Sequence, residues 1–168
     1  MFKTIAAAVL AIAGTQVSAE TFTPTGGQRA GGNVLKFIQR VEKLNERGVE
    51  VRLDVPTCSS SCTLFLTADD VCVGANSRFK FHGPSANWTG VVTILTGVPM
   101  GLITHGMDEA ARAKVVERMG KVYDNRWQGL GDWFVKNAAQ KFGYDFVTVK
   151  GSSLNASFGI PLCEGDKQ

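Results

Sequence analysis

A serine-rich turn carries the residue types needed for acyl-group chemistry. Residues 58–62 read Cys-Ser-Ser-Ser-Cys, and they follow an apolar alternating stretch at the point where strand periodicity gives way to a helical segment. At such a position, the first backbone N–H groups of the helix can stabilise the oxyanion that forms when a hydroxyl attacks a carbonyl. The G-x-S-x-G pattern of a nucleophile elbow is absent. The turn also fits a plain helix cap held by disulfides.

His82 is the candidate base for a hydroxyl of this turn. It ends an apolar stretch, residues 79–82, and is followed by Gly83 and Pro84. The end of a strand would project its imidazole from a rigid element into a neighbouring cleft. A histidine at such a place can also be an ordinary hydrogen-bonded core residue. The catalytic reading therefore requires the histidine to meet a hydroxyl of the turn, because a serine is activated only by an adjacent base.

Three motifs, taken in order, resemble those of a known superfamily. Residues 31–33 read Gly-Gly-Asn, residues 58–62 form the serine turn, and residues 75–84 read Ala-Asn-Ser-Arg-Phe-Lys-Phe-His-Gly-Pro. Their order and intervals resemble the Clp-protease and crotonase superfamily, most closely its small exported branch of predicted periplasmic proteins. There, a Gly-Gly turn opens the first helix, an Ala-Ser-small segment carries the nucleophile, and a Pro-Asn-Ser-Arg strand ends in His and Pro. The resemblance covers residues 31–84.

The resemblance implies a serine hydrolase that acts on peptides or other acyl substrates without a cofactor. It makes Ser60 the nucleophile and His82 the general base. It also implies an oxyanion hole formed by the N–H of Ser61 and by the backbone of Gly31 and Gly32.

Asp132 is the third residue that the resemblance brings in. It lies in the Gly-Asp-Trp-Phe segment, residues 131–134, at about the distance beyond His82 at which the family places the acid that orients the imidazole. It can equally be the N-cap of a last helix. A second class of function also stays open, namely a binding or assembly module that keeps the fold without the chemistry.

The elements that would position these residues predict an α/β domain with a small, mostly parallel sheet flanked by helices. Apolar residues at three- and four-residue steps predict a helix over 34–44 with Asn33 as N-cap, and alternation predicts a strand over 49–55. The other predicted elements are a short buried helix at 63–68, strands at 71–73 and 79–81, and helices at 108–123 and 132–142.

The N-terminal edge of this domain is expected to lack the strands that members of the superfamily carry ahead of the Gly-Gly turn. Residues 20–29 are polar and glycine-containing, which predicts an irregular segment. This edge of the sheet is then either minimal or completed by a partner, which can be a second copy of the chain.

The first nineteen residues predict export. Lys3 precedes an apolar run over 5–13, and residues 17–19 read Val-Ser-Ala, which is the order of zones in a cleavable signal peptide. Removal of residues 1–19 leaves one domain, residues 20–168, in the periplasm or outside the cell. The net charge is only +3 and the charges are interspersed, so composition gives no reason to expect nucleic acid or a membrane surface as partner.

The four cysteines predict disulfides rather than a metal site. Their even number suits an oxidising compartment, and paired C-x-x-C spacings are absent. A redox pair at the serine turn is disfavoured because three residues separate its cysteines. Three pairings are open, and we favour Cys62 with Cys72 and Cys58 with Cys163.

Overall fold

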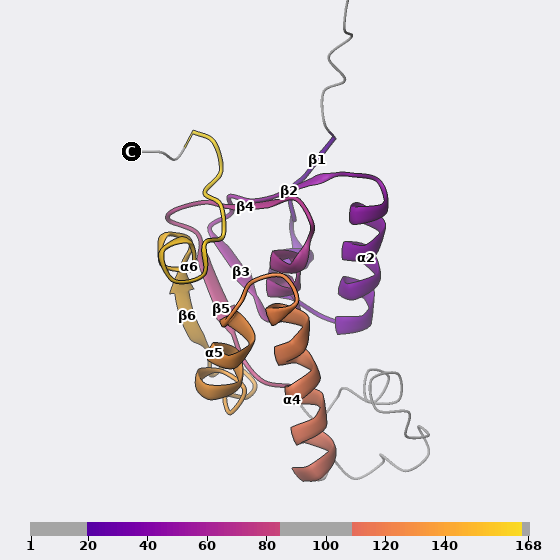
Figure 1. Ribbon diagram of the computed structural model, residues 1–168, viewed down its shortest axis with the longest axis vertical. Helices are drawn as coiled ribbons and strands as arrows, with labels where there is room; N and C mark the ends of the chain where they lie inside the picture. Colours follow the sequence, from indigo (N-terminus) through magenta and orange to yellow (C-terminus); the bar gives the residue numbers. More distant parts are fainter. Residues whose placement is uncertain (1–19, 85–108, 166–168) are drawn as a thin grey trace, which may run out of the picture.

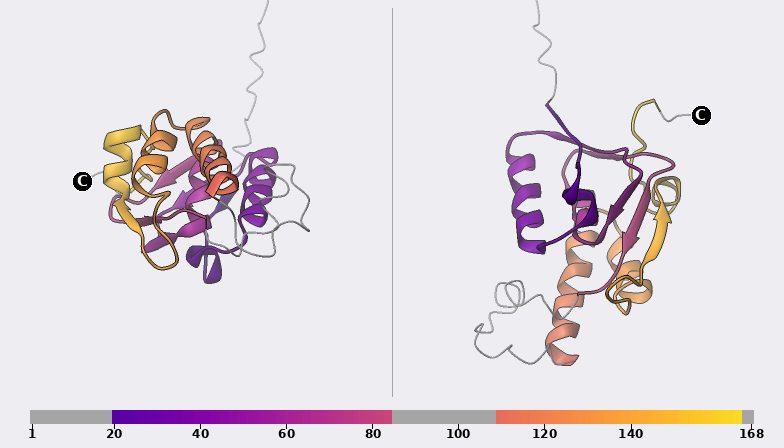
Figure 2. Two further views of the ribbon diagram at one scale, coloured as in Figure 1. Left: turned by 90° about the horizontal axis from the view of Figure 1, so that it is seen from below. Right: turned by 180° about the vertical axis from the view of Figure 1, so that it is seen from behind.

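The chain folds into an α/β structure in which helices flank two small sheets (Figure 1). This computed structural model describes residues 20–84 and 109–165. The predicted signal peptide, residues 1–19, lies outside the described residues. Helix α2 lies on one side of the strands, whereas β6 and α6 lie on the other (Figures 1 and 2).

The first sheet is wholly parallel, with the strand order β1-β2-β4. Its strands are β1 (Thr21–Phe22), β2 (Glu50–Leu53) and β4 (Val71–Val73). The apolar side chains of β2 and β4 are buried, which explains the alternating and apolar patterns in the sequence.

The second sheet has the order β3-β5-β6. Strand β3 (Thr57–Ser59) runs parallel to β5 (Arg78–Phe81), and β6 (Val147–Lys150) pairs antiparallel to β5. The β3–β5 pair positions the candidate site, because Ser60 directly follows β3 and His82 directly follows β5.

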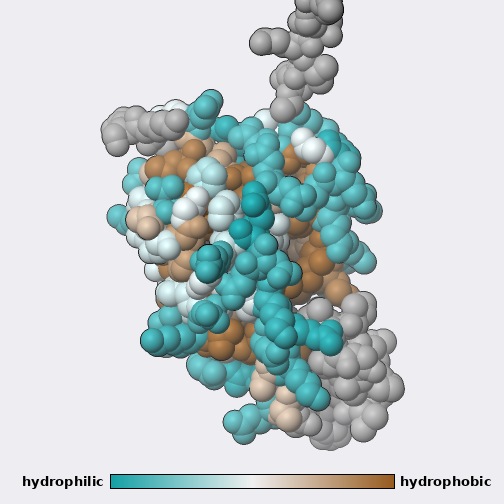
Figure 3. Space-filling view, viewed as in Figure 1, coloured by the Kyte–Doolittle hydropathy of each residue, from teal (hydrophilic) through white to brown (hydrophobic). Residues whose placement is uncertain are grey.

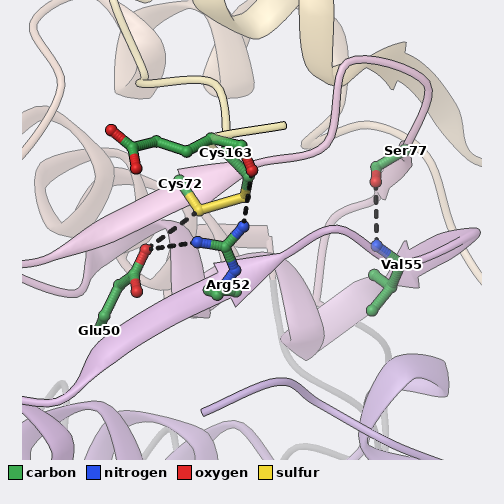
Figure 4. The surroundings of a disulfide bond; sticks show 7 residues. Glu50, Arg52, Val55, Cys72, Ser77 and Cys163 are labelled. Atoms are coloured by element: carbon green, nitrogen blue, oxygen red, sulfur yellow. Dashed lines mark hydrogen bonds and ion pairs between the residues drawn. A yellow bond between two sulfur atoms is a disulfide. The ribbon is translucent and has the colours of Figure 1, made fainter. Parts of the chain in front are cut away.

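The prediction of one sheet is wrong, because an interruption divides the strands into two groups. The predicted strand 49–55 ends at Leu53, and the chain re-enters a sheet only after Pro56, which has no N–H to donate to a ladder. At the break, the backbone N–H of Val55 donates to the Ser77 hydroxyl at 3.0 Å instead of to a strand carbonyl (Figure 4). The coarser prediction, an α/β fold with partly parallel sheets flanked by helices, is confirmed.

Helix α2 (Val34–Glu46) forms where the periodicity predicts it. The side chain of Asn33 accepts a hydrogen bond from the Lys36 N–H at 3.2 Å, which confirms the predicted N-cap. Its apolar face packs on the short 3-10 helix η1 (Ser60–Thr67). The remaining helices are α1 (Gly27–Ala30), α4 (Glu109–Asp124), α5 (Leu130–Asn137) and α6 (Gly151–Phe158), with α4 and α5 packed side by side (Figure 2).

Several elements were not predicted from the sequence. The segment 20–29 is not irregular, because it contains β1 and α1, so the expected absence of any strand ahead of the Gly-Gly turn is wrong. A strand of two residues has no alternation to detect, and only its pairing with β2 defines it. Helix α5 starts two residues earlier and ends five residues earlier than predicted, and β3, β6 and α6 were missed. None of the described helices is long and apolar enough to cross a membrane.

All four cysteines are paired, which confirms two disulfides, but the favoured pairing is wrong. The bonds join Cys58 to Cys62, with Cα atoms 5.3 Å apart, and Cys72 to Cys163, with Cα atoms 4.8 Å apart. The strand-to-helix turn brings the first pair together. The second pair forms because the C-terminal tail adds a parallel bridge to β4, so that Cys163 lies beside Cys72 (Figure 4). Two disulfides suggest an oxidising environment.

The two disulfides differ in the length of chain that they close, which predicts unequal contributions to stability. Their sequence separations are 4 and 91 residues. Replacing Cys72 and Cys163 together with alanine should lower the free energy of unfolding by about 3 kcal/mol more than replacing Cys58 and Cys62, because the longer loop gains more entropy in the unfolded chain. Chemical denaturation of the two double variants measures this difference, and a larger loss for the Cys58/Cys62 variant would contradict it.

Candidate functional site

Ser60 and His82 meet at the carboxyl ends of two neighbouring parallel strands. Ser60 directly follows β3 and His82 directly follows β5. The register pairs Ser59 with Lys80, so both strands end at the same edge of the sheet. There the Oγ atom of Ser60 and the Nε2 atom of His82 lie 2.6 Å apart, within hydrogen-bond distance. The fold thus joins the hydroxyl and the base that the sequence analysis selected.

The backbone at Ser60 has the sharp conformation of a strand-to-helix turn. Its φ of 56° is the one positive value at a non-glycine residue in the described part of the chain. Holding a serine there costs about 1–3 kcal/mol, and such strain tends to occur at functional sites. The Cys58–Cys62 disulfide spans this turn, and both cysteines are fully buried. The surrounding structure therefore holds the hydroxyl in a conformation that an unconstrained serine rarely adopts.

The Gly31-Gly32 backbone lies directly against the serine turn. A Cβ added to Gly31 would lie 2.6 Å from the Cβ of Ser60 and 3.0 Å from the backbone N of Ser61, so only glycine fits. The Ser61 hydroxyl donates a 2.7 Å hydrogen bond to the carbonyl of Gly32. The structure thus brings together the three residues assigned to the oxyanion hole and places them beside the hydroxyl.

The N–H groups of these residues are not equally available. The N–H of Gly31 donates a long hydrogen bond, 3.4 Å, to the carbonyl of Gln28 and would have to leave it to bind an oxyanion. Ser61 is the second residue of η1, in the first turn, where N–H groups have no acceptor within the helix. The N–H of Ser61 is therefore more available to an oxyanion than the N–H of Gly31.

A buried hydroxyl pair supports the serine turn, and the sequence analysis missed it. Thr63 donates a 2.7 Å hydrogen bond to the carbonyl of Ser60, and its Oγ1 lies 2.8 Å from the hydroxyl of Tyr123. Because Thr63 uses its single proton on Ser60, the Tyr123 hydroxyl is the donor to Thr63. Burial raises the pKa of Tyr123 far above its ordinary value, so it keeps this proton. In the sequence, Tyr123 is only one residue of an amphipathic helix, and nothing marks it as a partner of the turn.

Asp132 does not join Ser60 and His82. It is exposed in the first turn of α5, where it lines a cavity of about 550 Å³ between α4 and α5. The helix begins earlier than predicted, after Gly129, so Asp132 is not its N-cap either. A carboxylate in a first turn interacts favourably with the helix dipole, which is a sufficient reason for its presence there.

The second nitrogen of His82 has no acceptor in the described part of the chain. Its Nδ1 atom is buried and without a hydrogen-bond partner there, and the nearby aromatic ring is that of Phe146, edge-on with centroids 4.8 Å apart. If Nε2 accepts the proton of Ser60, then Nδ1 carries the hydrogen of the neutral ring. The described site is therefore a Ser-His dyad with an unsatisfied donor on its far side.

The position of His82 is fixed by the turn that follows it. The N–H of Gly83 donates to the carbonyl of Lys141 at 2.9 Å, and a Cβ on Gly83 would lie 2.1 Å from the carbonyl oxygen of Ala139. Partial burial lowers the pKa of His82 below its ordinary value of 6.5. The imidazole is therefore neutral at neutral pH, as a general base must be.

The lowered pKa of His82 predicts the acid limb of any activity at this site. Because the neutral ring is the active form, kcat/KM should be level near pH 7 and fall only as the pH drops through a pKa below 6.5. A pH profile of kcat/KM with an uncharged ester measures this directly. A half-maximal rate above pH 6.5 would contradict the assignment of His82 as a desolvated base.

The described residues contain no group of three or more His, Cys, Asp or Glu side chains that could hold a metal ion. Comparison with known proteins identifies no relative: no family model, curated protein or solved structure matches this chain.

Proposed function

We propose that the protein is an exported serine hydrolase, peptidase-like in its chemistry, with Ser60 as nucleophile and His82 as general base. The observation that carries the proposal is the 2.6 Å distance between Ser60 Oγ and His82 Nε2. The positive φ of Ser60 and the glycine backbone packed against it support the same conclusion. The motif resemblance to the Clp-protease and crotonase superfamily points to this chemistry too, and the two disulfides suit an exported protein.

The proposed reaction follows from this geometry. The Ser60 oxygen attacks the carbonyl carbon of an acyl substrate while its proton passes to His82 Nε2. The N–H of Ser61 stabilises the oxyanion, and Gly31 and Gly32 leave room for the carbonyl to approach. The C–N or C–O bond then breaks as the imidazolium returns the proton to the leaving group. Water, deprotonated by His82, hydrolyses the acyl-enzyme and regenerates the serine.

One observation favours the rival function, a binding or assembly module without chemistry. A catalytic histidine usually gains from an acceptor at Nδ1 that stabilises the imidazolium, and His82 has none in the described part of the chain. Without that acceptor the dyad would be a slower catalyst, and a module that has lost its activity could retain the same geometry.

Labelling with a fluorophosphonate separates these two functions. Only a serine activated by a base should form the phosphonyl adduct at an appreciable rate. We expect one adduct per chain in the oxidised protein, located by peptide mass spectrometry on the tryptic peptide that contains Ser60. Denatured protein is the control for nonspecific reaction, and equal labelling before and after denaturation would favour the binding module.

A further inference from the structure

We propose that the outer face of α2 is a binding groove for an acidic peptide segment, which makes the preferred substrate a peptide that carries acidic side chains. This inference rests on the proposed function, because it assigns a substrate class to the Ser60 site. It is drawn from two cavities and the charges that line them.

The two cavities form a path along α2, and one end of this path lies beside the serine turn. One, of about 330 Å³, is lined by Gly31 and Gly32 together with Lys36 and Arg40. The other, of about 560 Å³, is lined by the same Lys36 and Arg40 and extends to β1. Gly31, which lines the first cavity, packs directly against the Cβ of Ser60, so this end of the path adjoins the serine turn.

The path is basic along its whole length. The residues Lys36, Arg40, Lys43 and Arg47 recur at three- and four-residue steps and so lie on one face of α2. Among the described residues, Glu20 is the one acid that lines either cavity, and its carboxylate is already paired with Arg47. Within the described ranges, no carboxylate forms an ion pair with the other three cations. The hydrophilic surface over α2 is visible on the right of Figure 3.

The shape of the groove favours a peptide over other polyanions. Strand β1 is the edge of its sheet, so an extended peptide that passes it can form backbone hydrogen bonds with that edge. The guanidinium of Arg40 lies 4.8 Å from the centre of the Phe22 ring, which holds the charge above the edge strand. The groove also ends beside the serine turn, and an acidic protein segment bound there would bring a peptide carbonyl, which is the group that a serine nucleophile attacks.

The test measures binding of two labelled decapeptides, five Glu-Ala repeats and five Gln-Ala repeats, to the Ser60→Ala protein by fluorescence anisotropy at low salt. We expect the glutamate peptide to bind at least about tenfold more tightly than the glutamine peptide, because each exposed ion pair contributes a factor of up to about five in affinity. The Lys36→Gln/Lys43→Gln variant should lose most of this difference in affinity. The control variant is Lys114→Gln/Lys136→Gln, which removes the same charge from exposed positions on α4 and α5 and should bind like the parent.

Three outcomes would overturn the inference. The first is equal affinity for the two peptides, and the second is an equal loss of affinity in the two lysine variants. The third is tighter binding of a single-stranded oligonucleotide of equal charge that is lost in the Lys36→Gln/Lys43→Gln variant, which would make the groove a site for nucleic acid. Fluorophosphonate labelling of the Lys36→Gln/Lys43→Gln protein with Ser60 intact distinguishes failure of this inference from failure of the proposed function. Unchanged labelling of this variant shows that its hydrolase site is intact. Absence of labelling in the parent protein refutes the proposed function without affecting the peptide-binding result.

Discussion

Replacement of Ser60 with alanine is expected to reduce kcat/KM for p-nitrophenyl butyrate by at least about 10³-fold, because it removes the nucleophile and leaves only the oxyanion donors and binding contacts. His82→Ala should cause a loss of similar size, since without the base the hydroxyl is not activated. The double variant should be no slower than either single variant, because the two residues act as one unit 2.6 Å apart. Steady-state rates of the three variants test this.

The thermal stability of the serine variants supplies the control. Ser60→Ala should fold normally, whereas Ser60→Gly should be about 1 kcal/mol more stable than Ser60→Ala, because glycine adopts the φ of 56° without strain. If the double variant lost kcat/KM by the product of the two single-variant factors, Ser60 and His82 would act independently. In that case the hydrogen bond between them would have no catalytic role.

Gly31→Ala is expected to be the most damaging substitution outside the Ser-His pair. A Cβ at this position would lie 2.6 Å from Ser60 Cβ and 2.7 Å from the carbonyl oxygen of Ser59. Both atoms belong to a turn that is held by the hydrogen bond from Thr63 to the Ser60 carbonyl. Relief of this clash must move the serine turn away from the Gly-Gly backbone. We expect kcat/KM to fall by about 10²-fold through misplacement of the hydroxyl, and the free energy of unfolding to fall by more than about 2 kcal/mol.

Gly48→Ala is the matched control for this substitution. Gly48 also has a positive φ, +62°, but a Cβ there would meet nothing within 4 Å, so alanine adds backbone strain without a clash. It should lower the free energy of unfolding by about 1–2 kcal/mol and leave the activity unchanged. If Gly31→Ala behaved like Gly48→Ala in both measurements, the close approach to Ser60 would have no functional consequence.

The sequence was sufficient for features that depend on local patterns. The apolar repeat and Asn33 identified α2 and its cap, and the apolar run at 79–81 identified β5, the strand that His82 follows. Strand β3, which Ser60 follows, was expected to be part of a turn. The count of two disulfides followed from the even number of cysteines. The choice of Ser60 and His82 came from motif order and interval, and the structure places those two side chains in contact.

Features that depend on contacts between distant segments were not accessible in this way. The disulfide pairing was wrong because it is set by a bridge between β4 and the C-terminal tail, for which the sequence has no pattern. The role given to Asp132 came from the resemblance and from its distance along the sequence, neither of which shows what its side chain contacts in the fold. The support of the turn by Tyr123 is also a contact between helices 60 residues apart.

The sequence by itself thus determined several elements, among them α2, β2, β4 and β5, because hydrophobic periodicity and turn residues act over a few neighbouring positions. It also selected Ser60 and His82 as the candidate pair, through the order and intervals of its motifs. Only the tertiary structure decided how those elements meet: the division into two sheets, the close approach of Gly31 to Ser60, and the lack of a partner for His82 Nδ1 among the described residues. Each of these depends on excluded volume and hydrogen-bond geometry between segments far apart in the chain, and many different sequences satisfy such constraints.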